Sequence, residues 1–224
     1  MYWILFIGIS LVSWLVQRNL TKKFETYSRV PLAGHMLGRD IAERMLRDNG
    51  IHNVSVRQVG GDLTDFFNPA DMTVNLSDTV YCHNTVAAAA VAAHECGHAV
   101  QHKTGYSMLV LRTKLVPAVT FASKWVAWVL LAGILLVEVF PQLLMLGIGL
   151  FAITTLFSFV TLPVEIDASR RAIKWLETAG ITQGGDTVMA KDALHAAAYT
   201  YVAAALGSLA TLVYYVFILL GRRD

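Results

Sequence analysis

The hydropathy pattern of the chain is dominated by four long apolar segments. They cover residues 2–16, about 115–139, about 142–163 and about 196–220. The last three each reach the roughly 20 residues that a helix needs to cross a bilayer. Basic residues follow the first segment at once and no small-residue cleavage site appears, which favours an anchor over a cleaved signal peptide. The pattern predicts four transmembrane helices with a tight turn at Pro141, and a buried hairpin of a soluble protein explains such long apolar runs less well.

A mixed pattern fills the stretch between the first two apolar segments. Residues 36–49 carry apolar side chains at helical spacing and are followed by Gly50, which predicts an amphipathic helix. Residues 54–59 and 72–76 alternate apolar and polar positions, which predicts a small antiparallel sheet. The last strand, near Thr73 to Leu76, is open to two interpretations: an exposed edge that pairs with a substrate peptide, or a strand that only packs in the core.

Composition supports the membrane assignment and excludes other functions. Of the 224 residues 55% are hydrophobic and only 15% are charged, and the mean hydropathy is +0.52, which is too apolar for an ordinary soluble domain. The formal net charge of +2 is too small to indicate nucleic-acid binding. The two cysteines, Cys82 and Cys96, flank a helix, so no disulfide is expected, and Cys96 is expected to be a small buried side chain.

The strongest chemical signal lies in the alanine-rich stretch 84–102, which contains the pattern His-Glu-x-x-His at His94, Glu95 and His98. Residues four apart stack on one face of a helix, so the two histidines can offer their nitrogens to one tetrahedral Zn²⁺. Glu95 then lies beside the open coordination position, as a general base for amide hydrolysis requires. Chance occurrence of the pattern is the alternative, but two imidazoles in an apolar helix would need partners.

A catalytic zinc needs a third protein ligand, and the best candidate lies just after the third apolar segment. Glu165 would complete a set of two histidines and one glutamate and leave the fourth position for water. A membrane hairpin returns the chain to the side it left, so Glu165 and residues 84–102 are expected on the same face of the membrane. Pro163 suits the first turn of a new helix. The alternative is that Glu165 and Asp167 only pair with Arg170 or Arg171.

Three polar residues precede or enter the last apolar segment at helical spacing: Asp192, His195 and Tyr199. His195 or Tyr199 could donate a hydrogen bond to a developing oxyanion. An interfacial histidine and a tyrosine of an aromatic belt explain the two residues equally well. His102 lies one turn beyond His98 and is expected at the rim of the site.

The chain also resembles the YugP-like family of bacterial neutral zinc membrane peptidases over nearly its whole length. The likeness is carried by Gly34, residues 49–50, 63–65, 68–69 and 76–77, the stretch 91–99 around the His-Glu-x-x-His pattern, and residues 162–169. It implies a zinc-dependent, membrane-embedded peptidase with ligands His94 and His98, Glu95 as the catalytic residue and Glu165 as the third ligand. The wider glutamate-zincin pattern has an aspartate four residues after the ligand glutamate, where this chain has Ser169.

Together these features predict an α+β membrane protein in which about four transmembrane helices carry a small zincin-like domain at the membrane surface. The expected parts are an anchor (1–17), the zincin-like domain (18–114), a transmembrane hairpin (115–163), a third-ligand helix and loop (164–195) and a C-terminal transmembrane helix (196–224). The expected function is zinc-dependent proteolysis of membrane-associated or misfolded polypeptides. The alternatives are a zinc-binding scaffold or sensor and a small-molecule amidohydrolase.

The distribution of basic residues predicts the orientation in the cell membrane. By the positive-inside rule the zincin-like domain is expected in the cytoplasm. The residues that carry this expectation are Arg18, Lys22, Lys23, Arg29, Arg39, Lys114, Arg170, Arg171 and Lys174. Arg222 and Arg223 oppose it, because four crossings place the C-terminus on the other side.

Overall fold

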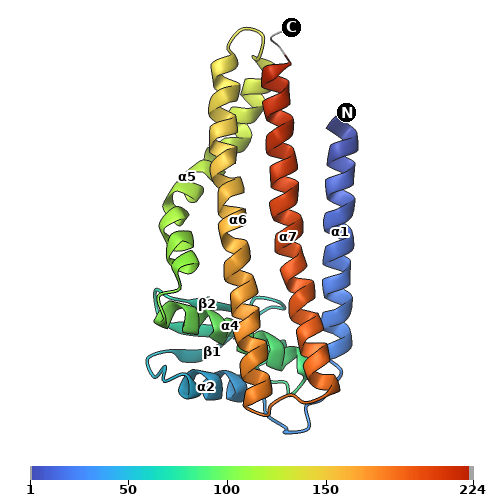
Figure 1. The fold of residues 1–224 in the computed structure, drawn as a ribbon, viewed down its shortest axis with the longest axis vertical. Coiled ribbons are helices and arrows are strands. Elements are labelled where there is room, and N and C mark those ends of the chain that lie inside the picture. The colour runs from blue at the N-terminus through green and yellow to red at the C-terminus, as the bar shows by residue number, and fades with distance from the viewer. Residues whose placement is uncertain (1, 222–224) are drawn as a thin grey trace.

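A computed structural model describes residues 2–221; its four long helices carry a small domain at one end (Figure 1). The long helices are α1 (Tyr2–Tyr27), α5 (Ser107–Leu135), α6 (Pro141–Thr178) and α7 (Gly185–Leu220). All four are long and apolar enough to cross a membrane, which confirms the predicted number. The start of α1 and the end of α7 both lie at the end away from the small domain (Figure 1). Arg222 and Arg223 lie outside the described residues.

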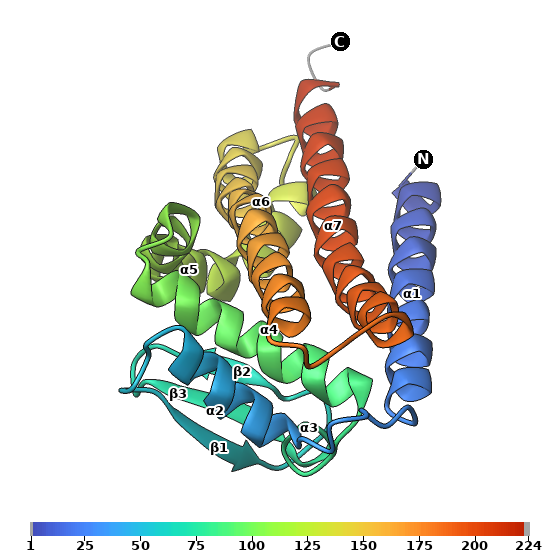
Figure 2. The same cartoon turned by 60° about the horizontal axis from the view of Figure 1, so that its bottom comes forward.

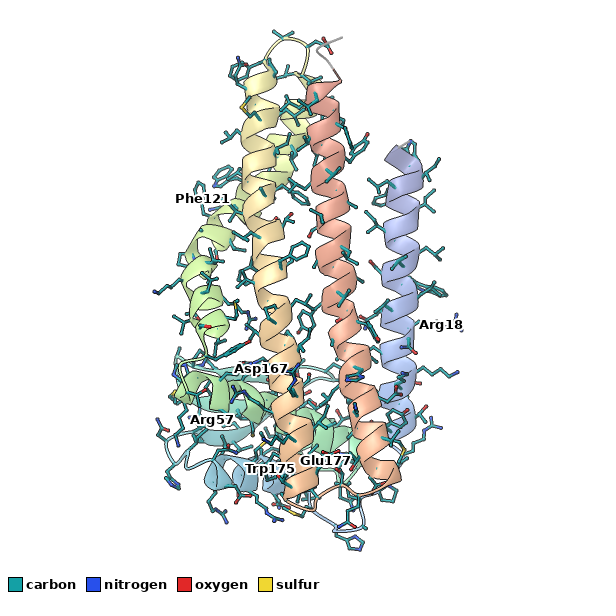
Figure 3. All side chains as sticks on the ribbon, viewed as in Figure 1. Arg18, Arg57, Phe121, Asp167, Trp175 and Glu177 are labelled. Carbon is teal, nitrogen blue, oxygen red and sulfur yellow. The ribbon has the colours of Figure 1, made fainter. Side chains whose placement is uncertain are left out.

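Helix α6 is longer than the sequence suggested, because Pro163 lies inside it and does not begin a new helix. Proline removes a backbone hydrogen bond and costs about 3 kcal/mol in a helix interior. Packing against α5, α7 and α4 along its length holds α6 together across this position. One continuous helix therefore runs from the membrane segment into the small domain and carries Asp167 to the level of that domain (Figure 3).

Outward-facing side chains of the long helices fit a lipid environment. Phe121 projects from α5 (Figure 3) and is exposed, as are Trp128 on the same helix and Ile4 on α1.

Near the small domain, Asp192 links α7 to α1. Its carboxylate accepts hydrogen bonds from Lys23 Nζ and from the Tyr27 hydroxyl, both at 2.6 Å.

The small domain consists of α2, a three-stranded sheet, the short helix α3 and α4, with α2 and α4 packed against each other and the sheet (Figure 2). The bounds are α2 (Gly38–Asp48), β1 (Ser55–Val59), β2 (Phe66–Asn68), β3 (Thr73–Ser77), α3 (Asp78–Tyr81) and α4 (Val86–Lys103). The short apolar side chains of α4, mostly alanine, are almost all buried, so neighbouring backbones can approach this helix closely. Cys96 on α4 is fully buried, as expected.

The sheet is mixed, and the expectation of an antiparallel sheet is wrong for one strand pair. Its order is β1-β3-β2, with β1 parallel and β2 antiparallel to β3. This order makes β3, Thr73–Ser77, the central strand, and all five of its residues are buried. Its interpretation as an exposed edge is therefore also wrong. The strand next to α4 that has an unpaired edge is β2. The alternating pattern in the sequence could not show which strand is central and which is at the edge, because β2 is only three residues long and too short to be recognised by alternation.

Candidate metal centre

Two helices bring the three predicted ligands together. His94 and His98 lie one turn apart on α4, and Glu165 reaches them from α6. Glu165 Oε2 lies 3.3 Å from His94 Nε2 and 3.6 Å from His98 Nε2. One ligand atom from each residue lies within 4.8 Å of the others. All three side chains are mostly shielded from solvent.

The spacing of these atoms fits a zinc ion. Ligand atoms about 2.0–2.1 Å from a tetrahedral Zn²⁺ lie about 3.3–3.4 Å from one another. The two measured separations to Glu165 Oε2, 3.3 and 3.6 Å, agree with this value. Two neutral imidazoles and one carboxylate are also the donor set of catalytic zinc sites, which keep a fourth position open.

Hydrogen bonds on the far side of each imidazole orient the two histidines. His94 Nδ1 lies 3.1 Å from Ser169 Oγ, and His98 Nδ1 lies 3.1 Å from Gln101 Oε1. When each Nδ1 carries the proton and donates to these oxygens, both Nε2 lone pairs face Glu165 and are free for a metal. The wider glutamate-zincin pattern has an aspartate at the position of Ser169. Here the Ser169 hydroxyl contacts the ligand histidine His94 in its place.

Gln101 begins a chain of polar contacts that the sequence did not reveal. It is fully buried, and its amide nitrogen donates to the Val164 carbonyl and to Asp167 Oδ2, both at 2.8 Å. Arg171 Nε donates to the same Asp167 oxygen at 2.6 Å. The expected pairing of Asp167 with Arg171 is therefore present, and Asp167 supports the centre through Gln101. The only sequence signal for Gln101 is its position three residues after His98.

Glu95 is held by the edge of the sheet. Its Oε2 accepts a hydrogen bond from the backbone N–H of Phe67 in β2 at 3.0 Å, and the residue is only 8% exposed. Because Oε2 has this partner, Oε1 remains available for another proton. The strand edge and the carboxylate are thus fixed relative to each other.

The metal centre opens into a cavity of about 550 Å³. Its walls come from β2 and the residues on either side of it, and from α4, α5, α6 and α7. The lining includes Phe66, Phe67, Pro69, His94, Glu95, His98, His102, Leu109, Arg112, Thr113, Val116, Pro117, Glu165, Tyr201 and Asp65. His102 lies at the rim beside Phe67, with ring centroids 5.8 Å apart, as expected for a residue that is not a ligand.

The α7 residue that lines this cavity is Tyr201, and neither His195 nor Tyr199 does so. Tyr199 is 59% exposed, and His195 lies in a separate groove between α6 and α7 together with Lys174 and Lys191. The prediction for His195 and Tyr199 is therefore not supported. Helical geometry explains the difference: Leu194, Ala197, Ala198 and Tyr201 share the face of α7 that meets the centre.

Burial and the charges of the site alter the pKa values of Asp65 and His98 in the small domain. Burial raises the pKa of Asp65 to about 6; hydrogen bonds from Ser77 act against this rise, and the nearby charge of Glu95 adds to it. Burial by itself lowers the pKa of His98, but hydrogen bonding to Glu165 and the charges of Glu95 and Glu165 outweigh it, so the pKa of His98 is raised. The centre thus attracts positive charge, as a metal site does.

A His-Glu-x-x-His helix joined by a glutamate from a second helix, at the end of four apolar helices, defines a membrane protein with the ligand set of a zinc peptidase. Sequence comparison gives the family. Residues 2–220 match the model of the family described as "Putative neutral zinc metallopeptidase", and the chain belongs to this family. It is 41% identical over 213 residues to the "Putative membrane protease YugP" of Bacillus subtilis (strain 168), covering 95% of this chain and 94% of that protein. No solved structure matches significantly.

Proposed function

We propose that this protein is a zinc-dependent endopeptidase that uses Glu95 as a general base. The observation that carries the proposal is the convergence of His94, His98 and Glu165 beside a second carboxylate, Glu95, that belongs to no ligand set. A purely structural zinc site is closed by four protein ligands and has no use for a base. A zinc ion bound here would supply Lewis acidity, which polarises a carbonyl and lowers the pKa of water.

In this proposal the side chains of the cavity move one proton and stabilise one charge. Glu95 Oε1 accepts the proton of the attacking water, while Oε2 stays bonded to the Phe67 N–H. The same carboxylate then delivers the proton to the leaving amine. The Tyr201 hydroxyl, which lies beside Glu165, donates a hydrogen bond to the oxyanion that develops at the carbonyl. Tyr201 thus takes the role first expected of His195 or Tyr199.

The substrate of the proposed enzyme is an extended polypeptide. The unpaired edge of β2 lines the cavity next to Glu95, and such an edge can bind a peptide by strand addition. The Phe67 N–H is already engaged by Glu95 and is not available to the peptide, so the added strand would use the other backbone groups of this edge and lie next to the base. Entry beside the membrane helices favours membrane-associated or misfolded polypeptides as substrates, with the lipid bilayer as the surrounding partner.

We further infer that the small domain faces the cytoplasm. The described basic residues near it, among them Arg18, Lys22, Lys23, Arg170 and Lys174, outnumber those at the other end of the helices. Cysteine-labelling of a variant with a single cysteine near Asp71 tests this proposal. Labelling by a membrane-impermeant reagent in intact cells would contradict it.

The function is tested by metal analysis and a peptidase assay on the purified protein. We expect about one zinc per chain, hydrolysis of a casein-like substrate, loss of activity with a chelator and recovery when zinc is added back. Stoichiometric zinc without hydrolysis of any peptide would favour a zinc-binding scaffold or sensor. Hydrolysis of small amides alone would favour an amidohydrolase.

A further inference from the structure

One cation in the cavity has no anionic partner among residues 2–221, although every carboxylate around it has a hydrogen-bond or ion-pair partner. Arg112 of α5 lines the same cavity as β2. Its Nε atom is buried without a hydrogen-bond partner, and within residues 2–221 no carboxylate forms a salt bridge with it. The side chain is half-buried, and a buried N–H without a partner is costly, so this position suits an anion that the chain itself does not supply.

The acids of the cavity do not serve as that anion, because other donors engage each of them. Glu165 contacts the two ligand histidines, Glu95 accepts from the Phe67 backbone, and Asp65 accepts from the backbone and hydroxyl of Ser77. Arg112 instead stacks its guanidinium over the ring of Phe157, 5.9 Å from the ring centroid. That contact orients the side chain and leaves its charge uncompensated.

The position of Arg112 is set by one face of α5. The five α5 residues that line the cavity follow helical spacing, and Arg112 is the charged one among them: Leu109, Arg112, Thr113, Val116 and Pro117. Arg112 also acts electrostatically on Tyr201, next to Glu165. A peptide between the β2 edge and this face of α5 would therefore pass both the metal centre and the guanidinium.

We propose that Arg112 binds a carboxylate of the substrate and makes the enzyme selective for peptides that carry one close to the scissile bond. This inference rests on the proposed peptidase function and names its substrate class. A guanidinium binds a carboxylate through two parallel hydrogen bonds. In an endopeptidase this carboxylate is an Asp or Glu side chain; a C-terminal carboxylate beside the scissile bond would instead make the enzyme a carboxypeptidase, and the test distinguishes these sources.

The test uses fluorogenic peptides in matched pairs, one pair with a free or amidated C-terminus and others with Glu or Gln at each position beside the scissile bond. We expect kcat/KM to be about 10- to 100-fold higher for the acidic member of one pair. Arg112→Gln should abolish that difference, mainly through KM, and Arg112→Lys should keep part of it. The control is Lys114→Gln, which removes an exposed charge from the same helix outside the cavity lining and should keep the whole preference.

Binding to an inactive protein separates this inference from the proposed function. Glu95→Gln, with and without Arg112→Gln, is titrated with the same labelled peptides by fluorescence anisotropy. If the wild type cleaves no peptide, the peptidase proposal fails, while tighter binding of the acidic peptides that depends on Arg112 still supports the carboxylate site. Arg112→Gln should also unfold at an equal or higher temperature, because it removes a buried Nε–H that has no hydrogen-bond partner, whereas a structural role predicts a lower one.

Three outcomes would overturn the proposal. The first is equal hydrolysis and binding of both members of every pair by the wild type. The second is an equal loss on both members in Arg112→Gln, which would assign the guanidinium to a group common to all substrates. The third is an effect of Arg112→Gln that appears in vesicles containing phosphatidylglycerol and vanishes in vesicles of phosphatidylcholine alone, which would assign Arg112 to a lipid phosphate.

Discussion

Gly97 of α4 lies directly against Ala168 of α6: a Cβ atom on Gly97 would be 2.7 Å from the Ala168 carbonyl oxygen and 3.2 Å from its Cα. This contact joins the two segments that supply the ligands. Gly97 is one residue before His98, and Ala168 is three residues after Glu165. The absence of a side chain at Gly97 therefore sets the distance between α4 and α6 at the metal centre.

Gly97→Ala is predicted to weaken zinc binding. The backbone of α6 would have to move by several tenths of an ångström, which displaces Glu165 from the histidines and costs about 1–3 kcal/mol of stability. We expect at least a tenfold loss of zinc affinity in a competition titration with a chromophoric chelator. Gly149→Ala, a change at a helical position of α6 with nothing within 4 Å, should leave zinc affinity unchanged. Equal affinity of the two variants would contradict the prediction.

Glu95→Gln should separate metal binding from catalysis. The amide keeps the shape of the side chain and can still accept the Phe67 N–H, but it cannot take up the proton of water. Activity should fall by about 10²–10⁴-fold, with zinc stoichiometry and unfolding temperature close to those of the wild type. His94→Ala should lose both zinc and activity. An active Glu95→Gln protein would refute the mechanism.

Glu165 and Asp167 should differ in their effect on zinc. Glu165 lies 3.3 Å from His94 Nε2, whereas Asp167 accepts from Gln101 and Arg171 on the other side of the histidines. Glu165→Ala should abolish stoichiometric zinc. Asp167→Ala should retain most of it and lower activity or stability, because it removes an outer contact only. Zinc that survives in Glu165→Ala and is lost in Asp167→Ala would show the ligand assignment to be wrong.

Gln101 should matter for zinc affinity although it touches no metal. Gln101→Ala would leave His98 Nδ1 without its oxygen partner and Asp167 without one of its two donors. Loss of such an orienting contact typically costs 10- to 100-fold in metal affinity. Gln101→Glu should recover part of the loss, because a carboxylate oxygen can still accept from His98 Nδ1. A chelator titration of the three proteins measures the effect.

The features predicted from sequence are those that depend on local spacing or on long apolar runs. The membrane helices follow from hydropathy, and His94, Glu95 and His98 follow from helical periodicity. Glu165 could be proposed because a hairpin must return to the same membrane face. Hydropathy thus predicted the membrane helices, and local spacing predicted the motif.

The features that sequence did not reveal depend on tertiary contacts. The rotation of α7 about its axis places Tyr201 in the cavity in place of Tyr199, and spacing within one helix contains no information about that rotation. Helix α6 continues past Pro163 because it packs against α4, α5 and α7. The central position of β3 depends on a parallel partner, β1, that alternation cannot distinguish from an antiparallel one.

Asp65 should make the stability of the protein fall as pH rises from about 4 to about 6. Its pKa is raised to about 6 in the folded protein by burial, against an ordinary value of 3.8. Between these two values the folded chain holds a proton that the unfolded chain has lost, so each rise in pH favours unfolding. The loss is complete about one pH unit above this pKa and amounts to about 3 kcal/mol at most.

Asp65→Asn should remove this dependence. The amide oxygen can still accept from the Ser77 backbone and hydroxyl, and the side chain stays neutral at every pH. Relative to the wild type, the variant should therefore gain stability between pH 4.5 and pH 7.5. Denaturant unfolding in detergent with a chelator present measures the difference, and removing zinc keeps its own pH dependence out of the comparison. In Glu95→Gln the fall should be smaller, because the charge of Glu95 contributes to the raised pKa of Asp65. Parallel stability curves for the wild type and Asp65→Asn would show that Asp65 is not the group responsible.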